Sequence, residues 1–259
     1  MEAFERVQAA RSKGRPTGTD FINHIFDDFI EMHGDRRFGD DKAIVAGIAR
    51  LNGMPVTVIA LERGHDTKEK LYRNFGSAHP EGYRKALRQM KLAEKFHRPV
   101  VCFVDTAGAF CGIAAEERGQ GEAIAENLSE MMTLKTPIIS VFIGEGGSGG
   151  AIGLAVADEV WMLENALYSV ISPEGCASIL WKDSSKVKEA ASCLRMTAED
   201  LLAFGVVDFV LPEPEGGAHV DPQQMALHLR RYLIHTLRKY RKIPAGRLVR
   251  RRNTRYRRI

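Results

Sequence analysis

The residues Gly144-Glu145-Gly146-Gly147-Ser148-Gly149-Gly150-Ala151 decide how the rest of this chain is interpreted. The apolar residues 137–143 precede them and are too few for an isolated helix, so they predict a buried strand. Residues 151–157 predict a short buried helix. A strand, a glycine turn and a helix start direct free backbone N–H groups and the positive end of the helix dipole at one point. We therefore predict a site for an oxygen that is, or becomes, negatively charged.

Two nucleotide-binding motifs match this octapeptide only in part. Gly144-x-Gly146-x-x-Gly149 fits the dinucleotide fingerprint, with Glu164 about twenty residues further on. The helix that follows is short for the crossover that this fingerprint requires. A phosphate-binding loop requires Lys and then Ser or Thr after the last glycine, where Ala151 stands, so we reject it.

A serine hydrolase is an open alternative. Gly146-x-Ser148-x-Gly150 matches the nucleophile elbow, in which Ser148 would be acylated. Its histidine would have to come from a polar, charged C-terminal region, which contains His219, His228 and His235. A purely structural turn is the other alternative, but five glycines in seven residues carry a high cost in backbone entropy.

The composition narrows the class of protein. The chain has 259 residues, of which 44% are hydrophobic, so it can form one large domain or two small ones. No run of eighteen apolar residues predicts a membrane span, and the first residues do not resemble a secretory signal. Cys102, Cys111, Cys176 and Cys193 are scattered without zinc-site spacing. We expect reduced thiols in a cytoplasmic protein that binds no metal through this chain.

The net charge of +4 conceals an uneven distribution. Residues 238–259 contain eleven Lys or Arg and no acid, whereas the rest of the chain has 26 basic against 33 acidic residues. We expect residues 238–259 to form a disordered, solvated basic tail. Nucleic-acid binding and docking on an acidic partner subunit are the alternatives. Residues 1–18 are polar and contain two glycines and a proline, so we expect a flexible arm.

Between arm and tail, short strands alternate with helices. A hairpin is predicted at Asn52-Gly53, which separates apolar residues 44–51 and 55–61. Two strands for each helix, with glycine turns, favour a stacked spiral over a doubly wound sheet. Helices are predicted at 19–30, 80–96, 113–132, 172–181, 197–204 and 223–241, and further strands at 100–104, 138–143, 160–163, 168–171 and 206–211.

Several long runs of residues resemble one family. They are 41–50, 67–70, 73–76, 80–88, 115–120, 144–151 and 169–182, within a likeness that covers about 21–224. The family is the carboxyltransferase alpha subunit of bacterial acetyl-CoA carboxylase. The resemblance implies a crotonase-like α/β fold, a β-β-α spiral over residues 19–237, between the arm and the tail.

The resemblance also implies partners and a reaction. Such a subunit pairs with a zinc-ribbon beta subunit, in a heterotetramer of two alpha and two beta chains. The pair works with biotin carboxylase and the biotin carboxyl carrier protein. It moves a carboxyl group from carboxybiotin on the carrier to acetyl-CoA, giving malonyl-CoA for fatty-acid synthesis.

This chemistry requires backbone donors for developing oxyanions and no catalytic triad. By family analogy, the alpha subunit holds the biotin oxygen. We predict that the N–H groups of Gly149 and Gly150 bind it, with Gly146 and Gly147 shaping the turn. We also expect Gly146, Gly147, Ser148 and Gly108 to contact the substrate. Gly112 and Ile113 are a second choice, because they begin another helix after a glycine loop.

One functional loop departs from the family. The family has D-T-P-G-A-Y-P-G where this chain has Asp105-Thr106-Ala107-Gly108-Ala109-Phe110-Cys111-Gly112. Without the two prolines we expect a looser loop around Gly108, with Cys111 as a reactive thiol or a small filler. Several basic side chains could bind the phosphates of CoA or form solvated faces. They are Lys68, Lys70, Arg73, Arg84, Lys85 and Arg88.

Overall fold

The computed structural model describes residues 1–258. The predicted hairpin lies near one edge of its sheet. β2 (Ile44–Leu51) and β3 (Met54–Leu61) pair antiparallel, and Leu51 faces Met54 at the turn. Asn52 and Gly53 have φ values of 50° and 77°, the left-handed conformation that a two-residue hairpin turn of this type requires. The hairpin prediction is confirmed.

The sheet has eight strands in the order β1-β2-β3-β4-β5-β6-β8, and β7 pairs with the end of β5. From β3 onward all pairings are parallel. The first half of β5 pairs with β6, whereas Glu145, Gly146 and Gly147 pair with β7, so β5 connects two layers of the spiral. The further strands are β1 (Asp27–Glu31), β4 (Val100–Thr106), β5 (Ile138–Gly147), β6 (Glu159–Leu163), β7 (Leu167–Ser169) and β8 (Phe209–Leu211).

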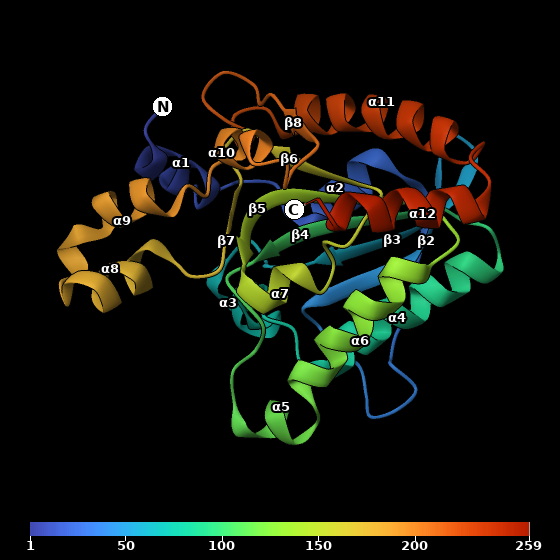
Figure 1. The fold of residues 1–259 in the computed structure, drawn as a ribbon, viewed down its shortest axis with the longest axis horizontal. Helices are drawn as coiled ribbons and strands as arrows, with labels where there is room; N and C mark the ends of the chain where they lie inside the picture. Colours follow the sequence, from blue (N-terminus) through green and yellow to red (C-terminus); the bar gives the residue numbers. More distant parts are fainter. Residues whose placement is uncertain (259) are drawn as a thin grey trace.

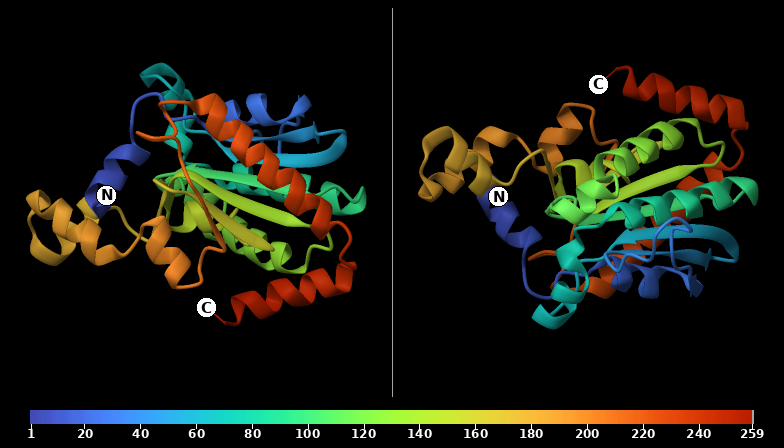
Figure 2. Two further views of the ribbon diagram at one scale, coloured as in Figure 1. Left: turned by 90° about the horizontal axis from the view of Figure 1, so that it is seen from above. Right: turned by 90° about the horizontal axis from the view of Figure 1, so that it is seen from below.

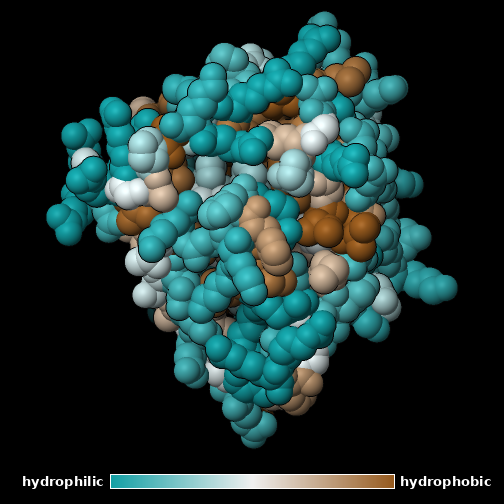
Figure 3. Space-filling model, turned by 90° about the vertical axis from the view of Figure 1, so that its right-hand side faces the viewer, coloured by the Kyte–Doolittle hydropathy of each residue, from teal (hydrophilic) through white to brown (hydrophobic). Residues whose placement is uncertain are grey.

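Helices cover both faces of this sheet (Figures 1 and 2). α4 (Pro80–Lys95) and α6 (Gln120–Thr133) pack side by side over one face, and α2 (Gly18–Ile25) packs with α11 (Pro222–Tyr240) on the other. Every residue of β4 is therefore buried, which explains its uninterrupted apolar sequence. The end of the molecule at the α11–α12 connection is largely hydrophilic, with small apolar areas (Figure 3).

The helix predicted over residues 19–30 is shorter than expected. α2 ends at Ile25 and β1 follows, because the backbone after Phe26 pairs with β2, where Ile30 faces Ile48. An apolar stripe with helical spacing cannot reveal this alternative, since the strand partner lies elsewhere in the chain. The long helix expected after Gly112 is also two helices, α5 (Ile113–Glu117) and α6, separated by Gly119 with a φ of 78°.

The expected flexible arm is wrong for its first part. Residues Ala3–Ala10 form α1, and Val7 is buried against Met196. Three arginines attach the arm to the body. Arg6 donates to the carbonyl oxygen of Glu164 at 2.7 Å, and Arg15 donates to that of Ile143 at 2.8 Å. Arg11 binds at the functional site described below.

The expected disordered tail is also wrong. α11 continues to Tyr240, and α12 (Ala245–Tyr256) packs against α6. Arg252 is 1% exposed and forms an ion pair with Asp158, and Arg255 pairs with Asp208 at 2.9 Å. The prediction failed because it considered only the net charge of the tail residues. The acidic partners of Arg252 and Arg255 lie about 50 to 90 residues earlier in the chain, so the tail sequence alone could not reveal them.

Four further helices lie at the surface or between the strands already described. α8 and α9 form a hairpin that projects from the body beside α1 (Figure 1). Ser172 caps α8 by accepting a hydrogen bond from Gly175 N–H, as its Ser-Pro start predicted. Among the helices described, none is long and apolar enough to cross a membrane. The four are α3 (Thr67–Tyr72), α8 (Pro173–Trp181), α9 (Val187–Leu194) and α10 (Ala198–Ala203).

Candidate active site

The glycine octapeptide forms a sharp bend at the end of β5. β5 ends at Gly147, and α7 (Ser148–Ile152) begins with the next residue. Ser148 is exposed and has a φ of 44°, a left-handed conformation that costs a serine free energy. The predicted order of strand, turn and helix is confirmed, and the strain lies at the turn itself. The predicted bounds are wrong, because β5 continues through Gly147 and α7 ends at Ile152, before most of the helix expected over residues 151–157.

Close backbone contact explains two of the glycines. A Cβ on Gly147 would lie 2.0 Å from the carbonyl oxygen of Ala107, and one on Gly150 would lie 2.5 Å from the backbone nitrogen of Ala109. The bend therefore packs directly on the loop 105–112, which brings Gly108 beside it. Gly146 is needed for another reason, because its Cβ would lie 2.3 Å from the ring of Phe142.

Gly149 differs from these glycines. A Cβ at Gly149 would meet only Ile124 Cδ1 within 4 Å, at 3.6 Å, and Gly149 is half-buried beside exposed Ser148. Within residues 1–258, no side chain and no backbone carbonyl outside the helices and strands accepts a hydrogen bond from the N–H of Gly149 or Gly150. The first turn of a helix leaves such N–H groups without intrahelical acceptors. The bend therefore combines open space with unpartnered donors.

A network of buried charges lies under the bend. Asp105 at the end of β4 accepts a hydrogen bond from Glu145 N–H at 2.9 Å. Arg63 lies 3.4 Å from Asp105 Oδ1 and 2.5 Å from Glu145 Oε2, and Arg11 donates to Glu145 Oε1 at 2.6 Å. Both oxygens of Glu145 are thus paired, which fits a structural role for Glu145 rather than that of a general base.

The electrostatics of this network favour the charged form of Arg63 but not that of Asp105. Burial works against a charged Arg63, but Asp105 and Glu145 together raise the pKa of its guanidinium. Burial raises the pKa of Asp105, and the charge of Arg63 opposes that shift. The residues were missed in the sequence because they come from four separate segments, and no short motif connects them.

Arg11 joins the bend to the projecting hairpin. Its Nη1 lies 2.6 Å from Oε1 of Glu174 in α8, while its Nε binds Glu145. Beside it, a small cleft of about 50 Å³ opens between the bend, β7 and the start of α8. Its lining includes Arg11, Gly146, Gly147, Ser169, Ser172 and Pro173.

The loop 105–112 is better fixed than its lost prolines suggested. Thr106 Oγ1 donates to the carbonyl oxygen of Gly108 at 2.8 Å, and Phe110 N–H donates to that of Ala78 at 3.1 Å. The Phe110 ring stacks on His79 with centroids 4.0 Å apart. Cys111 is exposed and free. These contacts replace part of the rigidity that proline would supply.

The structure does not bring the second predicted donor pair to the bend. Gly112 and Ile113 begin α5, which lies well away from α7 in Figure 1. Ile113 is 81% exposed. The first half of the loop 105–112 therefore packs against the bend, whereas its second half leads away from the bend to α5.

Three of the six predicted basic side chains lie near the end of β4, whereas Arg84, Lys85 and Arg88 lie on α4. Lys68 and Lys70 belong to α3, and Arg73 follows it and donates to the carbonyl oxygen of Lys42 at 2.9 Å. A Cβ on Gly76 would lie 2.6 Å from the carbonyl oxygen of Asp105, so this segment packs on the strand end. Lys68 remains exposed.

The catalytic triad of a serine hydrolase is not assembled. His228 and His235 lie on α11, which packs against α2, whereas α7 contacts β4, β5, β7 and α6. Among the hydrogen bonds of residues 1–258, none joins a histidine to Ser148. Nor do three His, Cys, Asp or Glu side chains gather as a metal site would require, within the same residues.

Solved structures share the fold of this chain. It is similar to the transcarboxylase 12S core solved with methylmalonyl-coenzyme A bound, with a TM-score of 0.71 at 21% identity over 89% of this chain and 44% of that one. It is also similar to a Pseudomonas malonate decarboxylase hetero-dimer, with a TM-score of 0.70 at 18% identity over 93% of this chain and 96% of that one. The architecture is that of the crotonase-like carboxyltransferases, as predicted.

Sequence comparison then shows the family. Residues 1–259 match the family described as acetyl co-enzyme A carboxylase carboxyltransferase-like, and the chain belongs to it. The chain is 65% identical to an acetyl-coenzyme A carboxylase carboxyl transferase subunit alpha from Ruminiclostridium cellulolyticum, over all of this chain and 98% of that protein. It is 58% identical to the subunit alpha of Clostridium perfringens, over all of this chain and 95% of that protein. The resemblance stated from the sequence is confirmed.

Proposed function

We propose that this chain is the alpha half of a carboxyltransferase that transfers a carboxyl group from carboxybiotin to acetyl-CoA and forms malonyl-CoA. The 65% identity to a named alpha subunit along the whole chain supports this assignment. The observation that carries the mechanism is the bend at Gly149, where open space meets N–H groups without acceptors. Carboxybiotin, held by a separate carrier protein, supplies the carboxyl group and leaves negative charge on an oxygen of its ring.

The role of this chain is to stabilise that charge. Backbone N–H groups that are fixed before the reaction stabilise a developing oxyanion without reorganisation. Gly149 and Gly150 offer such groups, and the contacts of Gly147 and Gly150 with the loop 105–112 hold them in place. Arg11 and Arg63 fix Glu145 from both sides, so the last residues of β5 cannot shift easily. Lys68, Lys70 and Arg73 lie near enough to the strand end to attract the phosphates of CoA.

A biotin ring would fit beside the residues at the bend. The side of Gly149 is open, and its N–H lies in the first turn of α7, where no intrahelical acceptor is available. Glycine at this position lets a flat ring approach the backbone where a side chain would stand in its way. Gly112 and Ile113 would serve a second oxygen only if a partner subunit completed the site around α5.

The partners belong to the same proposal. A zinc-ribbon beta subunit would complete the acyl-CoA site, in a tetramer of two alpha and two beta chains, and would work with the biotin carboxyl carrier protein and biotin carboxylase. The exposed apolar side chains of α8 support a protein partner there, since such a patch is unfavourable in water. Ile179, Leu180 and Trp181 are 68%, 63% and 40% exposed.

Carboxyl transfer and serine hydrolysis predict opposite results for Ser148→Ala. The chain is co-expressed with the beta subunit encoded in its genome, and acetyl-CoA formation from malonyl-CoA and biocytin is measured. We expect Ser148→Ala to retain activity within about threefold, because the mechanism uses backbone donors and alanine keeps the same backbone strain. A fluorophosphonate probe should leave Ser148 unlabelled. Labelling of Ser148, or loss of all activity in the alanine variant, would contradict the proposal.

Nucleic-acid binding by the C-terminal residues is a second candidate. Arg247, Arg250, Arg251 and Arg258 line a groove with Phe204, and this combination of cations and an aromatic ring suits single-stranded nucleic acid. We expect the double variant Arg250→Gln/Arg251→Gln to weaken binding of a single-stranded RNA and to reduce its salt dependence by about two units in the log–log slope. Carboxyl transfer should be unchanged. Equal RNA affinity in the variant and the parent protein would reject this role.

A further inference from the structure

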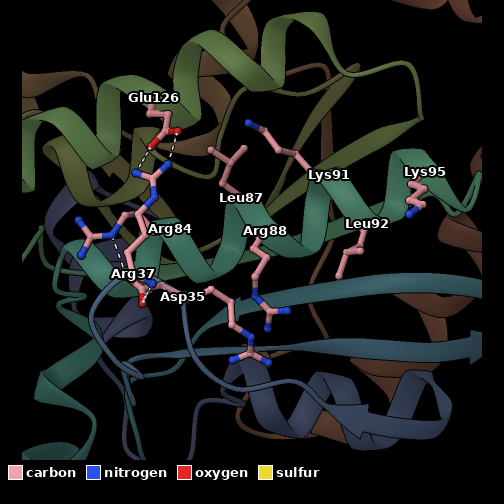
Figure 4. A pocket seen from close by; sticks show the side chains of 10 residues that line it. Asp35, Arg37, Arg84, Leu87, Arg88, Lys91, Leu92, Lys95 and Glu126 are labelled. Carbon is pink, nitrogen blue, oxygen red and sulfur yellow. Dashed lines mark hydrogen bonds and ion pairs between the residues drawn. The ribbon is translucent and has the colours of Figure 1, made fainter.

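A basic groove runs along the outer side of α4, away from the glycine bend (Figure 4). It has a volume of about 440 Å³, within the usual range of small-molecule sites. Arg84, Arg88, Lys91 and Lys95 recur at helical spacing and project from α4 into it, while Tyr83 on the adjacent face packs on Gly153. Nothing in the proposed carboxyl transfer uses this groove.

The loop opposite α4 is rigid and polar. Asp35 accepts hydrogen bonds from the N–H groups of Arg37, Phe38 and Gly39, and its other oxygen accepts from Arg84 at 2.8 Å. Lys85 is buried and donates to Asp40 at 2.7 Å, which ties the end of the loop to α4. The loop therefore presents its side chains from a fixed backbone.

Two guanidinium groups converge in this groove. Arg36 Nη1 and Arg88 Nη2 both donate to the carbonyl oxygen of His33, at 3.1 and 3.0 Å. Arg88 Nε donates to the carbonyl oxygen of Gly34 at 3.0 Å. Neither guanidinium has a carboxylate within ion-pair distance among residues 1–258. Arg36 also holds a φ of 68°, a conformation that costs free energy for a residue other than glycine.

The two carboxylates in the lining are already occupied. Asp35 binds Arg84, and Glu126 of α6 binds Arg37 through both of its oxygens, at 3.1 and 3.0 Å. Lys91 pairs with Glu130 outside the groove. Arg36, Arg88 and Lys95 are left as positive charges that the described residues do not neutralise. Burial and the charge of Arg36 both lower the pKa of Arg88, as expected for like charges held together.

We propose that the pair Arg36 and Arg88 forms a binding site for a compact ligand that carries a phosphate or diphosphate group. Planar guanidinium groups match phosphate oxygens in bidentate geometry, and a dianion between them would remove their mutual repulsion. The partly buried Leu92 and buried Leu87 give the groove an apolar side against which the rest of the ligand can pack.

The same phosphate chemistry has two possible sources. One is the diphosphate and phosphate of a CoA thioester, and the other is a separate phosphorylated metabolite that would regulate the enzyme. Inorganic pyrophosphate serves as the probe for both, because it contains only the group that the arginines recognise. Competition with coenzyme A separates the sources. Displacement of pyrophosphate by coenzyme A identifies the thioester, and simultaneous binding identifies a separate metabolite.

The test is calorimetric titration of the full chain with pyrophosphate. We expect one site per chain, and affinity about tenfold or more lower in Arg36→Gln/Arg88→Gln, because each variant position loses charge-assisted hydrogen bonds. The matched control is Arg231→Gln/Arg238→Gln, which removes two charges from another basic groove, on α11. This control should bind like the parent chain.

Two results would overturn the proposal. One is the absence of pyrophosphate binding by the parent chain. The other is equal weakening in both double variants, since that would show attraction to overall positive charge. If the double variant does not fold, as judged by its thermal unfolding, Arg36→Gln alone carries the test, because Arg36 is exposed and donates only to His33. Binding that is unchanged in Arg36→Gln would then reject the site.

Discussion

Replacement of Arg252 by methionine is expected to lower the free energy of unfolding by about 3–5 kcal/mol, because the change leaves a buried carboxylate without its partner. The Arg252 side chain is 0% exposed and lies 2.7 Å from Asp158 Oδ2. It also donates to the carbonyl oxygens of three residues at the end of α6 and the start of β5. These are Met131, Leu134 and Thr136, at 2.6, 2.8 and 3.0 Å. Urea unfolding of the purified chain measures the loss.

The pH dependence of this variant follows from Asp158. Burial raises the pKa of Asp158, and Arg252 opposes that shift. Without Arg252, the folded-state pKa of Asp158 lies above its unfolded value. The stability of the variant is then retained below the unfolded pKa and falls as pH rises through the folded pKa. The deficit relative to the parent protein should therefore shrink in acid.

Two further variants control for this effect. Asp158→Asn added to Arg252→Met should recover part of the lost stability, because the amide oxygen can still accept a hydrogen bond from Ile138 N–H and no charge remains buried. Arg251→Met removes the same charge at an exposed neighbour and should change stability by less than about 0.5 kcal/mol. Equal stability of Arg251→Met and Arg252→Met would contradict the role assigned to the buried pair.

Short sequence motifs correctly predicted those turns and helix starts that depend mainly on neighbouring residues. Asn52-Gly53 specified a turn that few other dipeptides can form, and the proline at the start of α4 marked a helix that ends within one residue of its prediction. Long-range partners decided the rest. Residues 27–31 became a strand because β2 was available, and residues 245–256 became a helix because Asp158 and Asp208 receive its arginines.

The same distinction applies to the site. The glycine bend was visible because its residues are contiguous, and the family resemblance supplied the chemistry. The network of Arg11, Arg63, Asp105 and Glu145 was invisible because 134 residues separate Arg11 from Glu145. The resemblance likewise gave no distances, so it could not show that Gly112 begins a helix remote from Gly149.

Gly149→Ala should reduce carboxyl transfer by about a hundredfold or more, because a methyl group beside this N–H would keep the biotin oxygen from reaching it, and loss of a single oxyanion contact has effects of this size. The new methyl group would occupy the space beside the N–H that the biotin oxygen needs. The fold should tolerate it, since the nearest atom is Ile124 Cδ1 at 3.6 Å and the φ of Gly149 is not positive. Gly147 and Gly150 cannot provide this test, because a Cβ there would collide with the loop 105–112.

The most direct test is therefore kcat/KM for acetyl-CoA formation from malonyl-CoA and biocytin, measured with the beta subunit present. Gly121→Ala on α6 is the matched control, because a Cβ there would meet no atom within 4 Å. We predict that Gly149→Ala falls to about one hundredth of the parent value or below, while Gly121→Ala is unchanged and both chains keep the parent melting temperature. Parent-like kcat/KM in a folded Gly149→Ala enzyme would show that the oxygen is bound elsewhere.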